Sequence, residues 1–423
     1  MLNLKLFTYL QGSNSASLLL RPSDPGMVRY FIMASTVNYS IVVSGQCEGE
    51  IANDAPMSFD VVLSSIVPLL DKNNKFRLSY VGGKLCFIEE HEKYTVTPLC
   101  VEHVSDTAID IAQRYLDTTA ELERSVELTA TRSKLEEELT YYENNYNHLR
   151  LLAGYGGPPA NPWGEPGDTV TEEDVDNKYL PKIEDLKKQI RELDCSERVV
   201  EVDMQKMKRL ASIAARYGTV ISMCGDYAIV SLNSCYILQK VDCGVRAMQG
   251  KMLQRLLQED SGQFFDIGGQ LVFRCVTGKG DAASDTMIFI QQYLPNVSVG
   301  KSIVTKGAVL EKYQISLKGM LPVISAVSSK FDKMVFEMGS SCLTMSNDRG
   351  ETLVHKFDVE DAKTLELNKA MRGEYSGAIV MSDISVPVEV QRILGSLKED
   401  FTIFIKDRKI VLQSGDLYVV FAR

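Results

Sequence analysis

The sequence predicts an α+β protein built from repeated small modules, with an antiparallel helical hairpin inserted between two of them. The first observation is an internal repeat. The segment at 217–221 recurs in related form at 331–335, and the segment at 238–242 resembles 354–358. The second observation is a seven-residue spacing of apolar side chains between the modules, which is typical of a coiled coil. A module that is used more than once indicates that the function resides in the assembled array.

The last module, residues 309–423, shows the expected order of elements most clearly. A strand at 312–316 precedes a helix, and paired strands follow across a turn at 339–341. A second helix, a hairpin and a final strand complete the module. The apolar positions of the two helices are Leu321, Ile324, Val327 and Phe331, and then Val390, Ile393, Leu394 and Leu397.

The middle module, residues 198–308, repeats that order. A strand at 198–202 leads into a helix at 203–217, and two strands, a second helix and a hairpin follow. The apolar sides of its two helices carry Met207, Leu210, Ile213 and Tyr217, and then Met252, Leu253, Leu256 and Leu257.

The first module, residues 1–104, matches the others only in its latter part. Its strands at 75–78 and 84–87 parallel the closing hairpin of the last module. An apolar stretch at 63–70 resembles a helix, although Pro68 must distort or end it. The opening of this module shows no convincing first helix.

A helical hairpin is predicted for residues 105–197. The long arm, about 105–152, would extend about 70 Å at the rise of an α-helix. The arms are unequal in length, so part of the long one must pack elsewhere or bend. The two apolar seams are Leu128, Leu135, Leu139, Tyr142, Tyr146 and Leu149, and then Ile183, Leu186, Ile190 and Leu193.

The tip of this hairpin, 153–170, is rich in glycine and proline and cannot be helical. It holds the single tryptophan, Trp163, together with Tyr155. An exposed aromatic side chain here is a candidate contact for a partner protein. The alternative is local packing of Trp163 against Pro159 or Pro166.

Composition excludes several classes of protein. A net charge of −10 argues against general coating of nucleic acid, but one local surface can still be basic. The nine cysteines show no CxxC pair, which indicates reduced thiols and not disulfides or a zinc site. No apolar run approaches the length of a membrane span, and the N-terminus lacks a signal-peptide pattern. We therefore expect a cytoplasmic protein, or one of the host cytoplasm or nucleoid if it is viral.

Catalytic motifs find little support. Gly300, Lys301 and Ser302 resemble the end of a phosphate-binding loop, but Pro295 occupies the position of its first glycine. No nucleophile-elbow, zincin or dinucleotide-binding motif occurs. We expect no catalytic residue, metal or cofactor. The four histidines are isolated in sequence: His91, His103, His148 and His355.

Basic side chains gather on the predicted helices of the last two modules. Most of those at 203–217 lie away from the apolar side of that helix, and only Asp203 opposes them. Basic helix faces in an acidic chain indicate a surface that meets phosphates. The alternative is that they only solvate outer helix faces. They are Lys206, Lys208, Arg209 and Arg216 on the first helix, Arg246, Lys251 and Arg255 on the second, and Lys330, Arg392 and Lys398 in the last module.

This order of strand, basic amphipathic helix, strand pair, second helix and hairpin resembles a domain of a DNA polymerase sliding clamp. The closing segment, 398–421, is similar to the end of a bacterial- or phage-type clamp. The resemblance covers the last two modules well and the first in part. It does not cover the hairpin.

The resemblance implies antiparallel sheets on the outside of a ring and helices on the inside. It implies that two chains close a six-domain homodimer, which holds double-stranded DNA by enclosure with little sequence readout. The ten basic residues named above become DNA-facing candidates. DNA polymerase or other replication factors would dock in an apolar pocket near the junction of the last two modules.

Two other functions stay open at this point. One is a viral or cellular scaffolding protein that assembles through its hairpin. The other is an enzyme whose site carries no recognisable motif.

Overall fold

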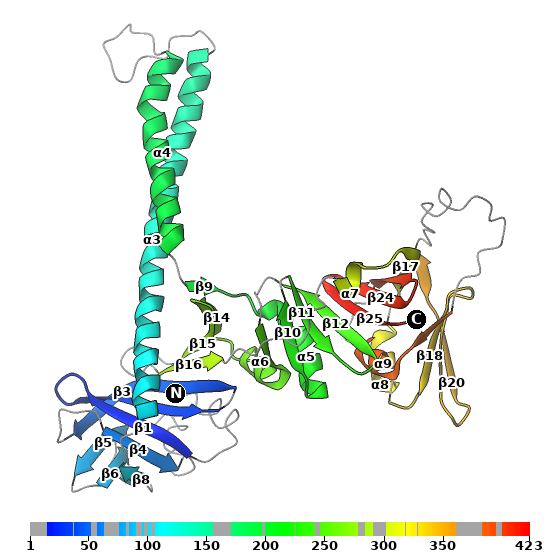
Figure 1. Ribbon diagram of the computed structural model, residues 1–423, viewed down its shortest axis with the longest axis horizontal. Helices are drawn as coiled ribbons and strands as arrows, with labels where there is room; N and C mark the ends of the chain where they lie inside the picture. Colours follow the sequence, from blue (N-terminus) through cyan, green and yellow to red (C-terminus); the bar gives the residue numbers. More distant parts are fainter. Residues whose placement is uncertain are drawn as a thin grey trace. The chain divides into compact units, whose positions relative to one another are not determined.

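The computed structural model of the chain divides into two compact units (Figure 1). Unit 1 comprises Met1–Ala34, Ser40–Glu201 and Phe265–Phe289, and unit 2 comprises Ser35–Tyr39, Val202–Phe264 and Ile290–Arg423. The residues that the structure describes are 15–36, 38–51, 57–62, 76–81, 84–89, 95–96, 100–102, 106–154, 171–196, 199–224, 226–241, 246–277, 284–290, 302–317, 319–327, 329–360, 383–394 and 400–423.

Unit 1 is built on a 12-stranded sheet whose main path runs β8-β4-β1-β2-β3-β16-β15-β14-β9. Strands β5, β6 and β7 branch from β3, and the β3–β5 pairing is parallel whereas β1–β2 and β5–β6 are antiparallel. The strands are β1 (Ser15–Pro22), β2 (Met27–Ser35), β3 (Tyr39–Ile51), β4 (Met57–Val62), β5 (Phe76–Val81), β6 (Lys84–Glu89), β7 (Thr95–Val96), β8 (Cys100–Glu102), β9 (Val199–Glu201), β14 (Gly262–Ile267), β15 (Gln270–Thr277) and β16 (Ser284–Ile290).

The long helix α3 (Asp106–Gly154) packs its first part against one face of this sheet. Small side chains at Ala108 and Ala112 allow the helix to approach the strands closely, and Tyr115 and Leu122 continue the same stripe at helical spacing. This part of α3 is therefore core. The strand residues beneath it are Leu19, Phe31, Met33, Val42, Val199, Ile267, Val272, Met287 and Phe289.

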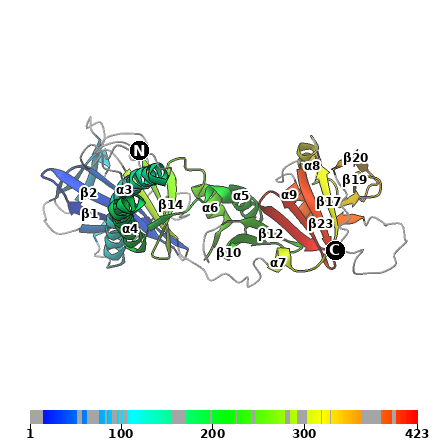
Figure 2. The same cartoon turned by 90° about the horizontal axis from the view of Figure 1, so that it is seen from above.

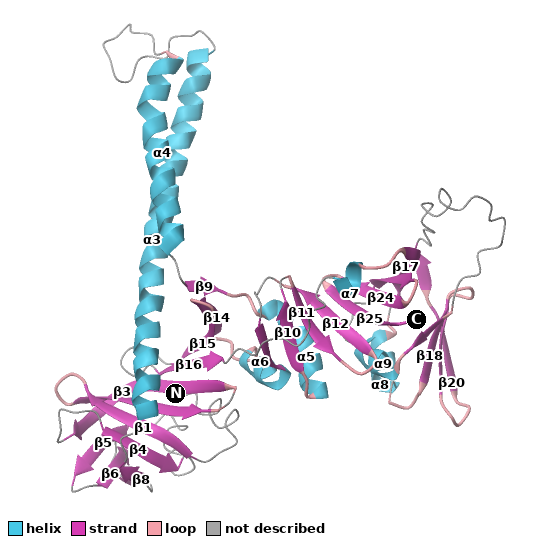
Figure 3. Ribbon diagram, viewed as in Figure 1, coloured by secondary structure: helices cyan, strands magenta, loops and turns pink. Residues whose placement is uncertain are grey.

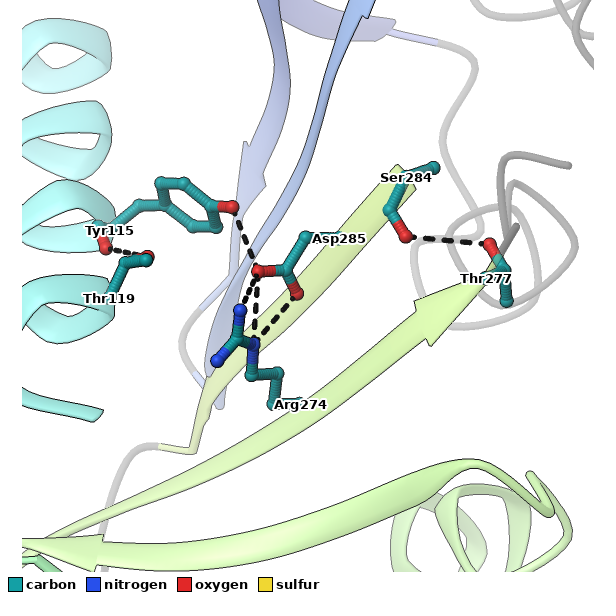
Figure 4. A network of polar contacts seen from close by, with 6 residues as sticks. All are labelled: Tyr115, Thr119, Arg274, Thr277, Ser284 and Asp285. Atoms are coloured by element: carbon teal, nitrogen blue, oxygen red, sulfur yellow. Dashed lines mark hydrogen bonds and ion pairs between the residues drawn. The ribbon is translucent and has the colours of Figure 1, made fainter. Parts of the chain in front are cut away.

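A partly buried polar network joins α3 to the sheet (Figure 4). The Tyr115 hydroxyl donates to Oδ2 of Asp285 at 3.0 Å, and Arg274 Nη2 donates to the same oxygen at 2.7 Å. Arg274 Nε also contacts both carboxylate oxygens. Burial, together with the neighbouring Asp285 carboxylate, raises the pKa of Tyr115 to about 12.

This raised pKa predicts a pH dependence of stability. A tyrosine in the unfolded chain ionises near pH 10. The contribution of Tyr115 to the stability of the fold is therefore fully present below about pH 10 and is lost as the pH rises toward the pKa of Tyr115 in the folded protein. Within that window this group should lower the free energy of unfolding by about 1.4 kcal/mol per pH unit. Urea denaturation of the protein and of Tyr115→Phe at a series of alkaline pH values measures the difference. Equal slopes in the two proteins would contradict the assignment.

Helix α4 (Glu172–Ser196) packs against the distal part of α3 (Figures 2 and 3). Ion pairs between the helices fix the direction: Arg132 reaches Asp194 at 2.7 Å, whereas Arg150, further along α3, lies 3.6 Å from Asp176, earlier in α4. The helices are therefore antiparallel. The apolar residues between them are Val175, Tyr179 and Ile183 of α4 and Leu139, Tyr142, Tyr146 and Leu149 of α3.

Unit 2 holds a nine-stranded sheet, ordered β13-β10-β11-β12-β25-β24-β23-β17-β21, and a four-stranded sheet, ordered β20-β19-β18-β22. Its strands are β10 (Val220–Cys224), β11 (Tyr227–Ser231), β12 (Cys235–Lys240), β13 (Arg246–Gln249), β17 (Val309–Ser316), β18 (Lys333–Glu337), β19 (Cys342–Ser346), β20 (Thr352–Lys356), β21 (Asp358–Glu360), β22 (Ile384–Val386), β23 (Asp400–Lys406), β24 (Lys409–Ser414) and β25 (Leu417–Ala422). Its helices are the 3₁₀ helix η1 (Gln205–Met207), α5 (Lys208–Tyr217), α6 (Gly250–Leu256), α7 (Ser302–Thr305), α8 (Leu321–Val327) and α9 (Val388–Leu394).

The predicted α+β class with antiparallel sheets is confirmed, but two details were wrong. Arg246 lies on strand β13, not on the second helix of its module, because 246–249 pair with β10. Helix α8 ends at Val327, so Phe331 is not part of it, and Lys330 lies in the turn that follows.

The predicted domain boundaries stay a prediction. Strands β14–β16, expected in the middle module, share the sheet of unit 1, whereas β10–β13 belong to unit 2. The predicted helix-like stretch at 63–70 lies outside the described residues, as do Tyr155 and Trp163 of the hairpin tip.

Candidate nucleic-acid interface

Helix α5 is the centre of the candidate interface, and its sequence explains where it lies and ends. Leu210, Ile213 and Ala214 form a buried side at helical spacing. Gly218 ends the helix in the left-handed region, with φ of 65°, where a side chain is disfavoured. The amide of Thr219 then donates to the carbonyl of Ala214 at 2.9 Å, which closes the last turn.

The opposite side of η1 and α5 presents the predicted basic residues to solvent. Lys206, Lys208, Arg209 and Arg216 are all exposed. Lys206 pairs with Asp203 at 3.7 Å, but both side chains are exposed, and such a pair contributes little. Four positive charges between residues 206 and 216 therefore face solvent with little compensation from acids, which suits contact with phosphates.

Helix α9 lies beside the end of α5 and adds a further cation. Arg216 Nη1 donates to the main-chain oxygen of Arg392 at 3.3 Å, and the Arg392 side chain is exposed. The Tyr217 hydroxyl donates to the main-chain oxygen of Glu389 at 3.5 Å. The Glu389 carboxylate accepts from the Ser234 amide at 2.8 Å, so α9 is held from two sides. The sequence does not point to Glu389, because these contacts join residues far apart in the chain.

Helix α6 supports α5 and contributes one exposed cation, Lys251. Arg255, in contrast, is half-buried and pairs with Glu259 at 3.0 Å, while its Nη1 donates to Gln258 Oε1 at 3.2 Å. The Glu259 carboxylate, just after the end of α6, therefore already compensates the charge of Arg255, which makes Arg255 a weaker candidate for DNA contact than Lys251.

The crossing of α5 and α6 depends on Gly250. A Cβ atom at this position would lie 2.4 Å from Ala214 Cβ and 2.7 Å from Ala214 C, which is closer than real contacts allow. We expect Gly250→Ala to lower the free energy of unfolding by about 1–3 kcal/mol through overpacking. Urea denaturation measures this loss. Gly339→Ala is the matched control, because nothing lies within 4 Å of a Cβ there; an equal effect of both changes would refute the close-approach argument.

Two other predicted DNA-facing residues do not lie on these helices. Arg246 starts strand β13, and Lys330 is exposed in the turn after α8. Lys398 lies outside the described residues. The described basic surface therefore consists of Lys206, Lys208, Arg209, Arg216, Lys251 and Arg392.

Within the described part of the chain, no helix is long and apolar enough to cross a membrane. Within the same residues, no group of three or more histidine, cysteine or acidic side chains is placed to hold a metal ion.

No family model matches the sequence, and no curated protein matches it. Solved structures do. A DNA polymerase sliding clamp from Pseudomonas aeruginosa matches with a TM-score of 0.52 at 11% identity, over 99% of this chain and 96% of that one. The chain has the fold of a sliding clamp. A DNA polymerase sliding clamp from Caulobacter crescentus matches this clamp fold with a TM-score of 0.50 at 11% identity, over 98% of this chain and 92% of that one.

Proposed function

We propose that this chain is a non-enzymatic processivity factor that encircles double-stranded DNA and tethers DNA polymerase or other replication factors to it. The observation that carries the proposal is the clamp fold over nearly the whole chain, combined with the exposed basic surface on α5, α6 and α9. Long lysine and arginine side chains contact phosphates without reading base edges, so binding is independent of sequence. Its place of action is the cytoplasm, or the host cytoplasm or nucleoid for a viral protein.

We further propose that two chains close the ring. Strand β20 ends the four-stranded sheet of unit 2, and its residues alternate between exposed and half-buried. Val354 in this strand is 59% exposed. An edge strand presents backbone donors and acceptors that can pair with a strand of another chain. This edge supports a homodimer in which sheets continue from one protomer to the next.

Partner proteins, in this proposal, dock on the apolar cluster where β11 and β12 meet β24 and β25. Tyr227, Ile229 and Leu238 lie there beside Val411 and Val420. Ile303 of the four-residue helix α7 covers the cluster. A short helix has few contacts of its own, so an apolar segment of a partner can replace it at modest cost.

Retention on circular DNA tests the proposal. The protein is assembled on a nicked circular duplex, with a loading factor if one is required, and washed at about 0.5 M salt, at which electrostatic binding alone is weak. Linearising the DNA with a restriction enzyme should then release the protein. Equal retention on circular and linear DNA would exclude encirclement.

A hairpin deletion separates this function from a scaffolding role. Arg132 and Asp194 are in contact, so a short Gly-Ser linker can replace residues 133–193 and leave the sheet-packed part of α3 in place. A clamp lacking the distal hairpin should stay a dimer and keep its retention on circles. Loss of all assembly with that deletion would favour a scaffold.

A further inference from the structure

Two arginines of unit 1 face each other across neighbouring strands. Arg21 of β1 and Arg29 of β2 are direct register partners in an antiparallel pair, and both are partly buried. Like charges placed directly opposite one another in a sheet are destabilising unless something compensates them. This pair therefore needs a counter-charge.

The same aromatic ring holds both guanidinium groups in place. The Cζ atoms of Arg21 and Arg29 lie 5.9 and 5.7 Å from the ring centre of Phe31. Phe31 is itself fully buried and packs edge-on against Tyr115. The buried Phe31 ring thus restricts the positions of both guanidinium groups before a ligand binds, which lowers the conformational entropy lost on binding.

The described residues offer no counter-charge to this pair. No described acidic side chain lies within ion-pair distance of Arg21 or Arg29, and the Nε atom of each is buried without a hydrogen-bond partner. The nearby Asp285 is already bonded to Arg274 and to the Tyr115 hydroxyl (Figure 4). The local excess of two positive charges stands out in a chain that carries 56 acidic residues.

We propose that Arg21 and Arg29 form an oxyanion site whose ligand is a phosphate group. Guanidinium forks bind planar or tetrahedral oxyanions through paired N–H donors. A phosphate monoester carries a charge of about −1.5 to −2 and three acceptor oxygens, which matches two arginines better than a single carboxylate does. Arg21 and Arg29 belong to unit 1, whereas the basic surface belongs to unit 2. The phosphate proposal therefore does not depend on whether the chain encircles DNA.

Titration with inorganic phosphate tests the site. At constant ionic strength, phosphate should raise the melting temperature of the protein in a saturable way, because a ligand that binds only the folded state stabilises it. Arg21→Gln and Arg29→Gln should each weaken the apparent affinity at least tenfold. Arg124→Gln, which removes an exposed arginine of α3, should leave it within twofold. An equal response of the protein and of the Arg21→Gln/Arg29→Gln double variant overturns the proposal.

A second arm identifies the source of the phosphate. A short oligothymidine with a 5′-phosphate is compared with the same oligomer without it and with a glutamate peptide of equal charge. Tighter binding of the phosphorylated oligomer, lost in Arg29→Gln, supports a nucleic-acid end; response to inorganic phosphate alone supports a small phosphorylated ligand. Equal binding of the glutamate peptide overturns the phosphate assignment. Arg29→Lys keeps the positive charge but lacks the paired N–H donors of a guanidinium group. It should therefore recover less than half of the phosphate affinity that Arg29→Gln loses.

Discussion

Reversing the charges of Arg209 and Arg216 together is expected to weaken duplex binding at least tenfold at about 0.1 M salt, because each change removes an attraction to phosphate and adds a repulsion. Both side chains are exposed and lie two helical turns apart on one side of α5. The plot of log affinity against log salt should become shallower by about 0.9 for each phosphate that is no longer neutralised. Fluorescence anisotropy of a labelled duplex over a salt series measures both quantities.

A control with the same change in net charge isolates the position of these residues. Arg124→Glu with Arg191→Glu reverses two exposed arginines of the hairpin, one on α3 and one on α4. The duplex affinity of this double variant, and the slope of its log affinity against log salt, should equal those of the unaltered protein within experimental scatter. If it weakens binding as much as the α5 variant does, the effect is one of overall charge and α5 is not the interface.

Removal of the Asp285 carboxylate is expected to lower the free energy of unfolding by about 2–4 kcal/mol, because it leaves the Arg274 guanidinium mostly buried and unpaired. The side chains of Arg274 and Asp285 are only 25% and 14% exposed, so water compensates the loss in part. The Tyr115 hydroxyl also loses its acceptor on the sheet. Urea denaturation of Asp285→Ala measures the cost, and hydrogen exchange of α3 amides reports whether its first turns loosen.

A double variant tests whether the loss comes from the unpaired charge. Arg274→Met with Asp285→Leu replaces both partners by apolar side chains of similar length and should recover at least half of the lost stability. If the double variant is as unstable as Asp285→Ala, packing at this position matters more than the ion pair. The two outcomes differ by more than the error of a denaturation curve.

The sequence predicted the hairpin because its signal is local. Apolar side chains at heptad spacing on α3 and α4 require a partner, and glycine and proline between the helices force a turn. The two predicted helices of the hairpin are unequal in length, so the first part of α3 must either pack against another part of the chain or bend. The sequence does not distinguish these two alternatives. Ala108, Ala112, Tyr115 and Leu122 follow one another at intervals of four, three and seven residues, which is helical spacing. Alanines in a helix, however, do not distinguish a face that packs on a sheet from an exposed one.

The exposure of the basic side chains was predictable where it depends only on the apolar stripe of a single helix. The positions of Arg209 and Arg216 follow from the apolar stripe of Leu210 and Ile213, which the structure buries. Arg246 was misplaced because its strand is only four residues long and is defined by pairing with β10, a non-local contact. The Arg255–Glu259 pair, by contrast, could have been found, since its i, i+4 spacing is visible in the sequence.

The arginine pair of unit 1 could not be predicted from the sequence. Arg21 and Arg29 become neighbours only once the turn between β1 and β2 sets the register, and Ser23 and Met27 close that turn through a backbone hydrogen bond of 3.1 Å. A shift of one residue would place the two side chains on opposite faces of the sheet. Pairing register is a tertiary property, so sites that depend on it appear only in the structure.

Images of single particles in the electron microscope test the central claim most directly. If clamp-like modules of two chains close around DNA, averaged views should show a ring with a central hole wide enough for a duplex, with one hairpin per protomer. Solid particles without a hole, or open filaments of varying length, would contradict the account.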